Sequence, residues 1–276
     1  MTTGIYFHEI LAEESWPIIG NRYSNFSKIL KDLEDELENA ILLSPQKPSE
    51  DLLLKTHSKK YFKQLKSASY FNGATLTVGA CVEASLRVWN MDLTNAVVFL
   101  AAAGHHAHPN SGWGGTYLSC IGPVLNILRA SGLSRLAYID TDSHHGDGAR
   151  EILQDDHDAL HVCFCSSDRR DEKANVCVDV GRRTDDEGYL EKVENELPLI
   201  ERFDPEIVIH FFGHDTHRDD YGDRGLSTDF FPRLARRMRD FADDVCNGRY
   251  VVIDGGGANS RVGRVIWPEI IRELSR

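Results

Sequence analysis

Side chains that can bind a metal or move a proton gather in four short segments, and each segment follows an apolar run. The apolar runs span residues 96–102, 136–140, 207–212 and 250–254. The segments after them are 104–108 (GHHAH), 140–148 (DTDSHHGDG), 213–220 (GHDTHRDD) and 254–259 (DGGGAN). If the runs are parallel strands of one sheet, their carboxyl ends meet at the edge where α/β proteins bind ligands. The sequence therefore predicts one polar site built from four segments.

The second segment carries the sharpest pattern, because Asp142 and His144 lie two residues apart. In an extended segment both side chains point to the same side. Asp215, after another predicted strand, supplies a third ligand. Three protein ligands and an open position are typical of a catalytic zinc, on which a water loses its proton near neutral pH. Because no thiolate takes part, iron or manganese could also occupy this site.

The adjacent His105 and His106 are expected to handle protons rather than the metal. Two neighbouring imidazoles do not easily bind one ion, but each can be oriented by a carboxylate. Asp140 and Asp147 flank the metal residues at suitable positions. A carboxylate raises the basicity of an imidazole and fixes its tautomer, so one ring can take a proton and the other can give one.

The elements that must position these residues alternate along the chain. Predicted strands span residues 4–8, 96–102, 136–140, 160–165, 176–180, 207–212 and 250–254. Predicted helices span residues 24–42, 75–89, 117–131, 189–203, 230–246 and 264–275, and a helix-capping signal lies at Ser49. Near-continuous apolar strands are typical of parallel sheets buried on both faces. We therefore expect an α/β fold in which a central, mainly parallel sheet lies between two helical layers, with residues 1–276 forming a single catalytic domain.

Composition and charge limit the kinds of molecule that the protein is expected to bind. The 276 residues carry a formal net charge of −12, which disfavours nucleic acid and anionic membranes and weakly favours cationic substrates. Neither a run long enough to span a membrane nor a secretory signal is apparent. The six cysteines form no CxxC pair, which is typical of a reduced protein, so we expect a cytoplasmic location.

These motifs resemble the zinc-dependent histone deacetylase and acetylpolyamine amidohydrolase family. GHHAH is similar to its tandem-histidine motif, YIDTDSHHGDG matches its DxDxHHGxG signature, and GHDTHRDD followed by GLS resembles its GxDxHxxD…GLS segment. The GGGAN stretch lies where the family has a glycine-rich loop, and FHEI and LLLKTHSKKY fit its N-terminal region. The resemblance covers nearly the whole chain and is strongest to the short class IV branch.

The resemblance implies an arginase/deacetylase-like fold and a role for each matching residue. Asp142, His144 and Asp215 would hold zinc, and His105 and His106 would be the tandem histidines, backed by Asp140 and Asp147. It also implies a channel-lining aromatic at Trp113, substrate contacts from Gly257 and Ala258, and a structural potassium ion held by Asp140 and backbone carbonyls.

The chain departs from the family at two places. Where the family has a tyrosine that donates to the oxyanion, this chain has Ala258, and losing one such donor typically costs about 10²–10³ in rate. Tyr117, Tyr221 or His214 could replace it from another direction. The GGTYLSC stretch after Trp113 also lacks the family's usual Cys-Asn pattern, so we expect a reshaped channel.

Three functions remain open at this stage. The first is a zinc-dependent hydrolase of an N-acyl amide, such as acetyl-lysine or an acetylated small amine, or of a related ester. The second is a catalytically weakened zinc- and ligand-binding homologue that acts as a sensor or partner subunit. The third is a ureohydrolase of the arginase type, which would need a DAHxD-like run that DTDSHHGDG does not match. An oligomer is possible in each case.

Overall fold

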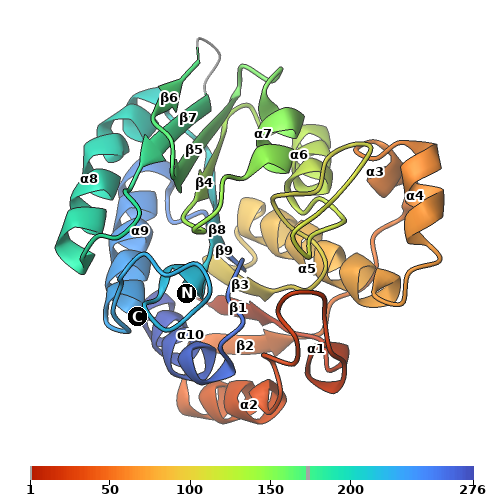
Figure 1. Ribbon diagram of the computed structural model, residues 1–276, viewed down its shortest axis with the longest axis horizontal. Coiled ribbons are helices and arrows are strands. Elements are labelled where there is room, and N and C mark those ends of the chain that lie inside the picture. The colour runs from red at the N-terminus through yellow and green to blue at the C-terminus, as the bar shows by residue number, and fades with distance from the viewer. Residues whose placement is uncertain (1, 172–174) are drawn as a thin grey trace.

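A computed structural model describes residues 2–171 and 175–276. Within these ranges nine strands form one sheet in the order β2-β1-β3-β9-β8-β4-β5-β7-β6 (Figure 1). The strands, in chain order, are β1 (Thr3–Tyr6), β2 (Ala40–Leu43), β3 (Asn95–Phe99), β4 (Leu136–Asp140), β5 (Ala159–Cys165), β6 (Arg169–Arg170), β7 (Asn175–Asp179), β8 (Ile207–Phe212) and β9 (Tyr250–Asp254). All neighbours pair in parallel except β6 and β7, which confirms the expected mainly parallel sheet.

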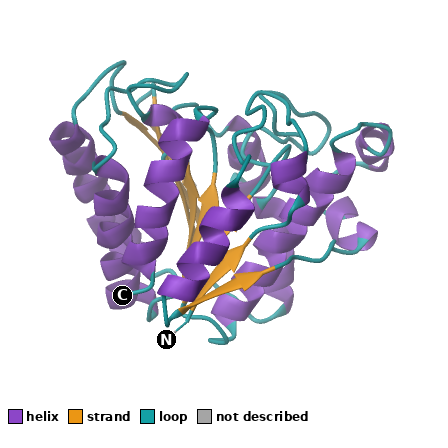
Figure 2. Ribbon diagram, turned by 90° about the horizontal axis from the view of Figure 1, so that it is seen from below, coloured by secondary structure: helices purple, strands orange, loops and turns teal. Residues whose placement is uncertain are grey.

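Helices cover both faces of this sheet, as Figure 2 shows edge-on. The helices are α1 (Ile10–Glu13), α2 (Phe26–Glu36), α3 (Glu50–Leu54), α4 (Lys59–Leu65), α5 (Phe71–Trp89), α6 (Ile121–Ala130), α7 (Asp147–Leu153), α8 (Asp186–Phe203), the 3-10 turn η1 (His214–Thr216), α9 (Phe230–Cys246) and α10 (Ser260–Leu274). Helices α5, α6 and α7 pack on one face, and α2, α8, α9 and α10 pack on the other. The expected three-layer α/β/α architecture is therefore confirmed. None of the described helices is long and apolar enough to cross a membrane.

Strand β3 shows why the apolar runs become central strands. Successive side chains of a strand point to opposite faces. Val97 and Phe99 join the core under α2 and α10, whereas Ala96 and Val98 join the core under α5. All four side chains are buried, so both faces must be apolar and the sequence reads as a continuous run.

Two predicted helices are wrong in their extent. The helix expected over 24–42 ends at Glu36, because Leu37 turns extended and residues 40–43 pair with β1 as the edge strand β2. The helix expected over 117–131 begins only at Ile121, because Leu118 bridges to Ala103. The helices α1, α4 and α7 and the short strand β6 were not predicted. The capping signal is confirmed, since the Ser49 side chain accepts a hydrogen bond from the Leu52 amide at the start of α3.

Candidate active site

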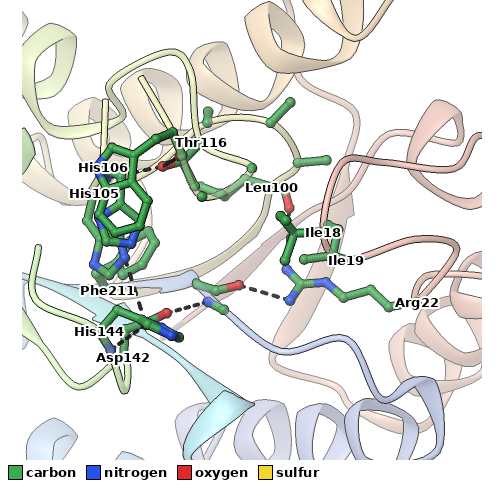
Figure 3. A pocket seen from close by; sticks show the side chains of 18 of the residues that line it. Ile18, Ile19, Arg22, Leu100, His105, His106, Thr116, Asp142, His144 and Phe211 are labelled. Carbon is green, nitrogen blue, oxygen red and sulfur yellow. Dashed lines mark hydrogen bonds and ion pairs between the residues drawn. The ribbon is translucent and has the colours of Figure 1, made fainter. Parts of the chain in front are cut away.

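The loops that follow β3, β4, β8 and β9 meet at the carboxyl edge of the sheet, around a cavity of about 230 Å³ (Figure 3). The chain leaves β3 through Ala102, whose left-handed φ of 54° is unusual for a residue with a side chain. Gly104 follows with a φ of 148°, and a Cβ there would lie 2.9 Å from the Thr116 side chain and 3.0 Å from the Phe211 ring. This tight turn directs the next two histidines into the cavity.

Two carboxylates and one imidazole converge at the floor of the cavity. The Nδ1 atom of His144 lies 3.0 Å from Asp142 Oδ1 and 3.0 Å from Asp215 Oδ2. Both aspartates are buried, while the His144 side chain is 41% exposed toward the cavity. The Asp142 carboxylate also accepts from the amides of His144 (3.0 Å) and Gly256 (2.7 Å), so the loops after β4 and β9 hold it in place.

The charges of this group favour a cation. Burial, together with the neighbouring Asp142, raises the pKa of Asp215. Burial also opposes the charged form of Asp142, but His105 and His144 hold its pKa well below the usual range. Hydrogen bonds to both carboxylates raise the pKa of His144 to about 10. Two buried carboxylates and a ring nitrogen lie close enough for one ion to replace the shared proton, and this donor set suits zinc, iron or manganese.

The tandem histidines each bind their own carboxylate. His105 Nδ1 lies 2.8 Å from Asp140 Oδ2, and His106 Nδ1 lies 2.7 Å from Asp147 Oδ1. A charged carboxylate only accepts hydrogen bonds, so each Nδ1 carries the proton when the ring is neutral. The two rings lie side by side with centroids 4.1 Å apart.

The two imidazoles differ in their titration. Burial lowers the pKa of His105, but Asp140 and Asp142 outweigh burial and raise it to about 9. Burial and the neighbouring His105 lower the pKa of His106 to about 4, although Asp147 opposes this shift. These shifts favour the charged form of His105 and the neutral, basic form of His106 beside the aspartate–histidine group.

Trp113 forms part of the cavity wall, as expected of a channel-lining aromatic. Its ring lies 3.8 Å, centroid to centroid, from the ring of His106, and its Nε1 donates to Asp147 Oδ2 at 2.9 Å. The indole is half exposed, so one face stays accessible from solvent. Ile18, which is 61% exposed, and Tyr221 also line the cavity.

Only the first part of the glycine-rich loop after β9 lines the cavity. Gly255 and Gly256 line it, whereas the described lining does not include Gly257 or Ala258. The Ala258 amide instead donates to the Asp220 carboxylate at 3.0 Å. The methyl group of Ala258 is half-buried and offers no hydrogen-bond donor.

Of the three donors considered in place of the tyrosine that the resemblance implies at position 258, only Tyr221 lies on the cavity. Its ring centroid is 5.7 Å from that of His144, and its hydroxyl oxygen accepts from the Gly257 amide at 3.1 Å. Burial, with Asp215 and Asp142, raises the pKa of Tyr221, so the phenol keeps its proton. His214 is buried and accepts from Trp267, and Tyr117 stacks on Tyr70 with centroids 4.4 Å apart.

Sequence reasoning missed Arg22, which is buried behind the glycine-rich loop (Figure 3). Its guanidinium donates to the carbonyls of Gly255 (2.9 Å) and Gly257 (2.6 Å) and lies 3.2 Å from the Asp254 carboxylate. Arg22 precedes the predicted helix 24–42 in an ordinary polar context, so no local pattern distinguishes it. Its role becomes visible only when the fold brings residue 22 next to residues 254–257.

This arrangement defines a class: an α/β protein with a carboxylate–imidazole group that could hold a metal and two carboxylate-backed histidines at the carboxyl edge of a mainly parallel sheet. The chain matches the histone deacetylase domain family over residues 17–274, and it belongs to that family. The expected family resemblance is therefore confirmed, and with it a deacetylase or amidohydrolase lineage.

Individual relatives agree with this assignment. The chain is 28% identical to a probable deacetylase of Archaeoglobus fulgidus, over 93% of this chain and 81% of that protein. It is 26% identical to a histone deacetylase-like amidohydrolase of Pseudomonas aeruginosa, over 90% of this chain and 74% of that protein. The crystal structure of the HDA15 HD domain is similar in fold, with a TM-score of 0.87, 19% identity and coverage of 99% of this chain and 89% of the other.

Proposed function

We propose that this protein is a zinc-dependent hydrolase that cleaves an N-acyl amide, such as acetyl-lysine or an acetylated small amine, or a related ester. The observation that carries the proposal is the convergence of Asp142, His144 and Asp215 beside the neutral, carboxylate-backed His106 on one cavity. A base next to a candidate metal group is the equipment that hydrolysis by an activated water requires. In this proposal residues 1–276 act as one catalytic domain.

Asp142, His144 and Asp215 would hold the ion, with zinc first and iron or manganese as alternatives. Once bound, the ion supplies Lewis-acid polarisation of an acyl carbonyl and acidifies a water. A structural potassium ion near Asp140 and the backbone carbonyls of the same loop also belongs to the proposal, because hard cations take oxygen ligands.

His106 and His105 divide the proton chemistry. Asp147 keeps the Nδ1 proton of His106 in place, so Nε2 is the basic atom that can accept a proton from water. His105, held as a cation by Asp140, stabilises negative charge that develops on the substrate or donates a proton to the leaving amine.

The Tyr221 hydroxyl is the proposed hydrogen-bond donor to the substrate oxygen, in place of the tyrosine that Ala258 has replaced. Its hydroxyl keeps its proton and accepts from the Gly257 amide, which leaves the O–H free to donate. Gly257 and Ala258, expected to contact substrate, would then act through the shape of the loop rather than through a side chain.

The substrate is proposed to be a small acylated amine or an acyl-lysine side chain. Trp113 and Ile18 offer an apolar passage for a methylene chain, and the net charge of −12 attracts a cationic molecule. Neither nucleic acid nor a membrane is a proposed partner. The six free cysteines fit a reducing cytoplasm.

The test is turnover of a panel of acyl-lysine peptides, acetylpolyamines and aryl esters by the zinc-loaded protein. Hydrolysis of at least one amide, abolished by chelation and restored by zinc, is the expected result. Zinc binding without turnover of any amide or ester would instead support the weakened homologue that acts as a sensor or partner subunit. Two manganese ions per chain with urea release would favour a ureohydrolase.

A further inference from the structure

A cluster of three thiols and one imidazole lies outside the proposed catalytic group. Cys163 and Cys165 are two residues apart on β5, so both point to the same face of the sheet. Cys177 on β7 is the register partner of Cys163. The three buried sulfurs pack against one another as a cluster separate from the two apolar cores. His145, from the loop after β4, completes the group.

The imidazole of His145 points one ring nitrogen at all three sulfurs. Its Nδ1 atom lies 3.7 Å from Cys163 Sγ, 3.7 Å from Cys165 Sγ and 3.6 Å from Cys177 Sγ. In a tetrahedral zinc site, with Zn–S of about 2.3 Å and Zn–N of about 2.0–2.1 Å, nitrogen and sulfur ligands lie about 3.6 Å apart. The three nitrogen–sulfur distances thus match the edges of a zinc tetrahedron, and the ligand atoms of His145, Cys163 and Cys165 all lie within 4.8 Å of one another. Cys177 Sγ is close to the imidazole but not to both of the other sulfurs, so it would move inward to become the fourth ligand.

The surrounding charges and the access route suit a divalent ion. The Arg150 guanidinium donates to Cys177 Sγ at 3.1 Å. Three thiolates, one Zn²⁺ and one arginine cation sum to zero, which avoids an uncompensated buried charge. His145 and Cys165 also line a second cavity, of about 780 Å³, through which an ion can arrive.

We propose that His145, Cys163, Cys165 and Cys177 form a second metal site, a closed Cys₃His zinc site. Soft thiolate ligands select zinc over magnesium or calcium, and a full set of four protein ligands is typical of structural rather than catalytic zinc. The ion would tie the loop after β4, which carries His144 next to His145, to β5 and β7. This proposal does not depend on the proposed hydrolase activity.

One neighbouring arrangement competes for Cys163. Asp140, His161 and Cys163 also lie close enough to share an ion. However, the Asp140 carboxylate already accepts from the His105 ring at 2.8 Å and from the Asp142 amide at 3.1 Å. Cys163 therefore has better partners in the thiol cluster than in this second group.

The experiment is a cobalt(II) titration of the reduced, metal-free full-length protein, followed by absorption spectroscopy. Thiolate ligands give an intense thiolate-to-cobalt charge-transfer band, which an oxygen and nitrogen site lacks. Wild type, with both proposed sites, and Asp215→Ala, with the thiolate site alone, should both develop this band, and in Asp215→Ala it should saturate at one equivalent of cobalt. Cys165→Ser/Cys177→Ser should lose it. The control, Cys246→Ser, removes a buried thiol on α9 and should keep it.

Absence of the band in both wild type and Asp215→Ala would overturn the proposal, whether or not the double variant folds. A disulfide between Cys163 and Cys177, found by mass spectrometry of protein purified without reductant and coupled with failure to bind cobalt after reduction, would overturn it equally. If a folded Cys165→Ser/Cys177→Ser protein keeps the band, the band comes from other thiols and the proposal is wrong. Loss of amide hydrolysis alone would bear only on the proposed function.

Discussion

At the scale of single residues, the three proposed metal ligands make the most direct prediction. Asp215→Ala removes a carboxylate that lies 3.0 Å from His144 Nδ1 and has no exposed surface. We expect the ion of this site to be lost and hydrolysis to fall below detection. The measurement is metal content by elemental analysis beside turnover. Cobalt(II) absorption separates the two proposed sites, because only the thiol cluster gives a charge-transfer band. If Asp215→Ala keeps the cobalt absorption that lacks this band, Asp215 is not a ligand.

His106→Ala separates proton transfer from metal binding. The ring contacts Asp147 and Trp113 but belongs to no candidate group of metal ligands among the described residues. General-base catalysis typically contributes about 10²–10⁴ in rate, so kcat should fall by that factor while the metal content stays at the wild-type value. If zinc is lost together with activity, His106 is a ligand and the proposed division of roles is wrong.

Tyr221→Phe tests the proposal that Tyr221 donates a hydrogen bond to the substrate oxygen. Removing one oxyanion donor typically costs about 10²–10³ in kcat, and we expect a loss of that size for amide hydrolysis. An activated ester has a better leaving group, so its hydrolysis should fall by less. Tyr117→Phe is the matched control, because that ring stacks on Tyr70 away from the cavity and should leave both rates unchanged. Equal rates for Tyr221→Phe and wild type on an amide would remove Tyr221 from the mechanism. Ala258→Tyr is a weaker test, because Ala258 does not line the described cavity.

At the scale of elements, the central strands and the residues that end them could be predicted because both signals are local. Continuous apolar runs predicted β3, β4, β8 and β9, and the DxDxH spacing predicted that Asp142 and His144 would lie together after β4. Residues 40–43 were misread as helix, because an apolar edge strand directly after an amphipathic helix continues its pattern, and only pairing with β1 decides between them. Arg22 and the thiol cluster depend on segments far apart in sequence, for which one sequence holds no signal, and the choice of Tyr221 over Tyr117 and His214 likewise needed the folded chain.

Arg22 links two such segments, so its removal should destabilise the fold. The guanidinium joins the loop before α2 to the glycine-rich loop and neutralises the buried Asp254. Breaking a buried pair from one side costs about 3–5 kcal/mol, and Arg22→Leu should lower the free energy of unfolding by that amount. Arg233→Leu, which breaks an exposed pair with Glu187, should cost less than about 1 kcal/mol. Urea unfolding measures both, and equal losses would contradict the structural role of Arg22.

At the scale of the whole molecule, buried histidines that do not line the cavity should make stability depend on pH. Burial lowers the pKa of His57 to about 4 and the pKa values of His161 and His210 to about 3. In the unfolded chain a histidine titrates near 6.5. The unfolded state therefore binds more protons than the folded state below that value, and stability falls as the pH drops from about 6.5 to about 4. Asp140, whose pKa burial raises to about 6, offsets part of this loss.

His57 is the best position to isolate this effect. Its Nδ1 donates to the His108 carbonyl at 3.1 Å and its Nε2 accepts from the Ser119 amide at 3.0 Å. The neutral ring thus joins the segment after α3 to the segment 104–108 and to the residues just before α6. Glutamine offers one donor and one acceptor but cannot be protonated. Between pH 7 and pH 4.5, His57→Gln should therefore lose about 2 kcal/mol less unfolding free energy than wild type, at 1.36 kcal/mol per pKa unit. His157→Gln, at an exposed position, should keep the wild-type slope. Urea unfolding at several pH values measures the difference, and parallel curves for His57→Gln and wild type would show that His57 does not stay neutral in the fold.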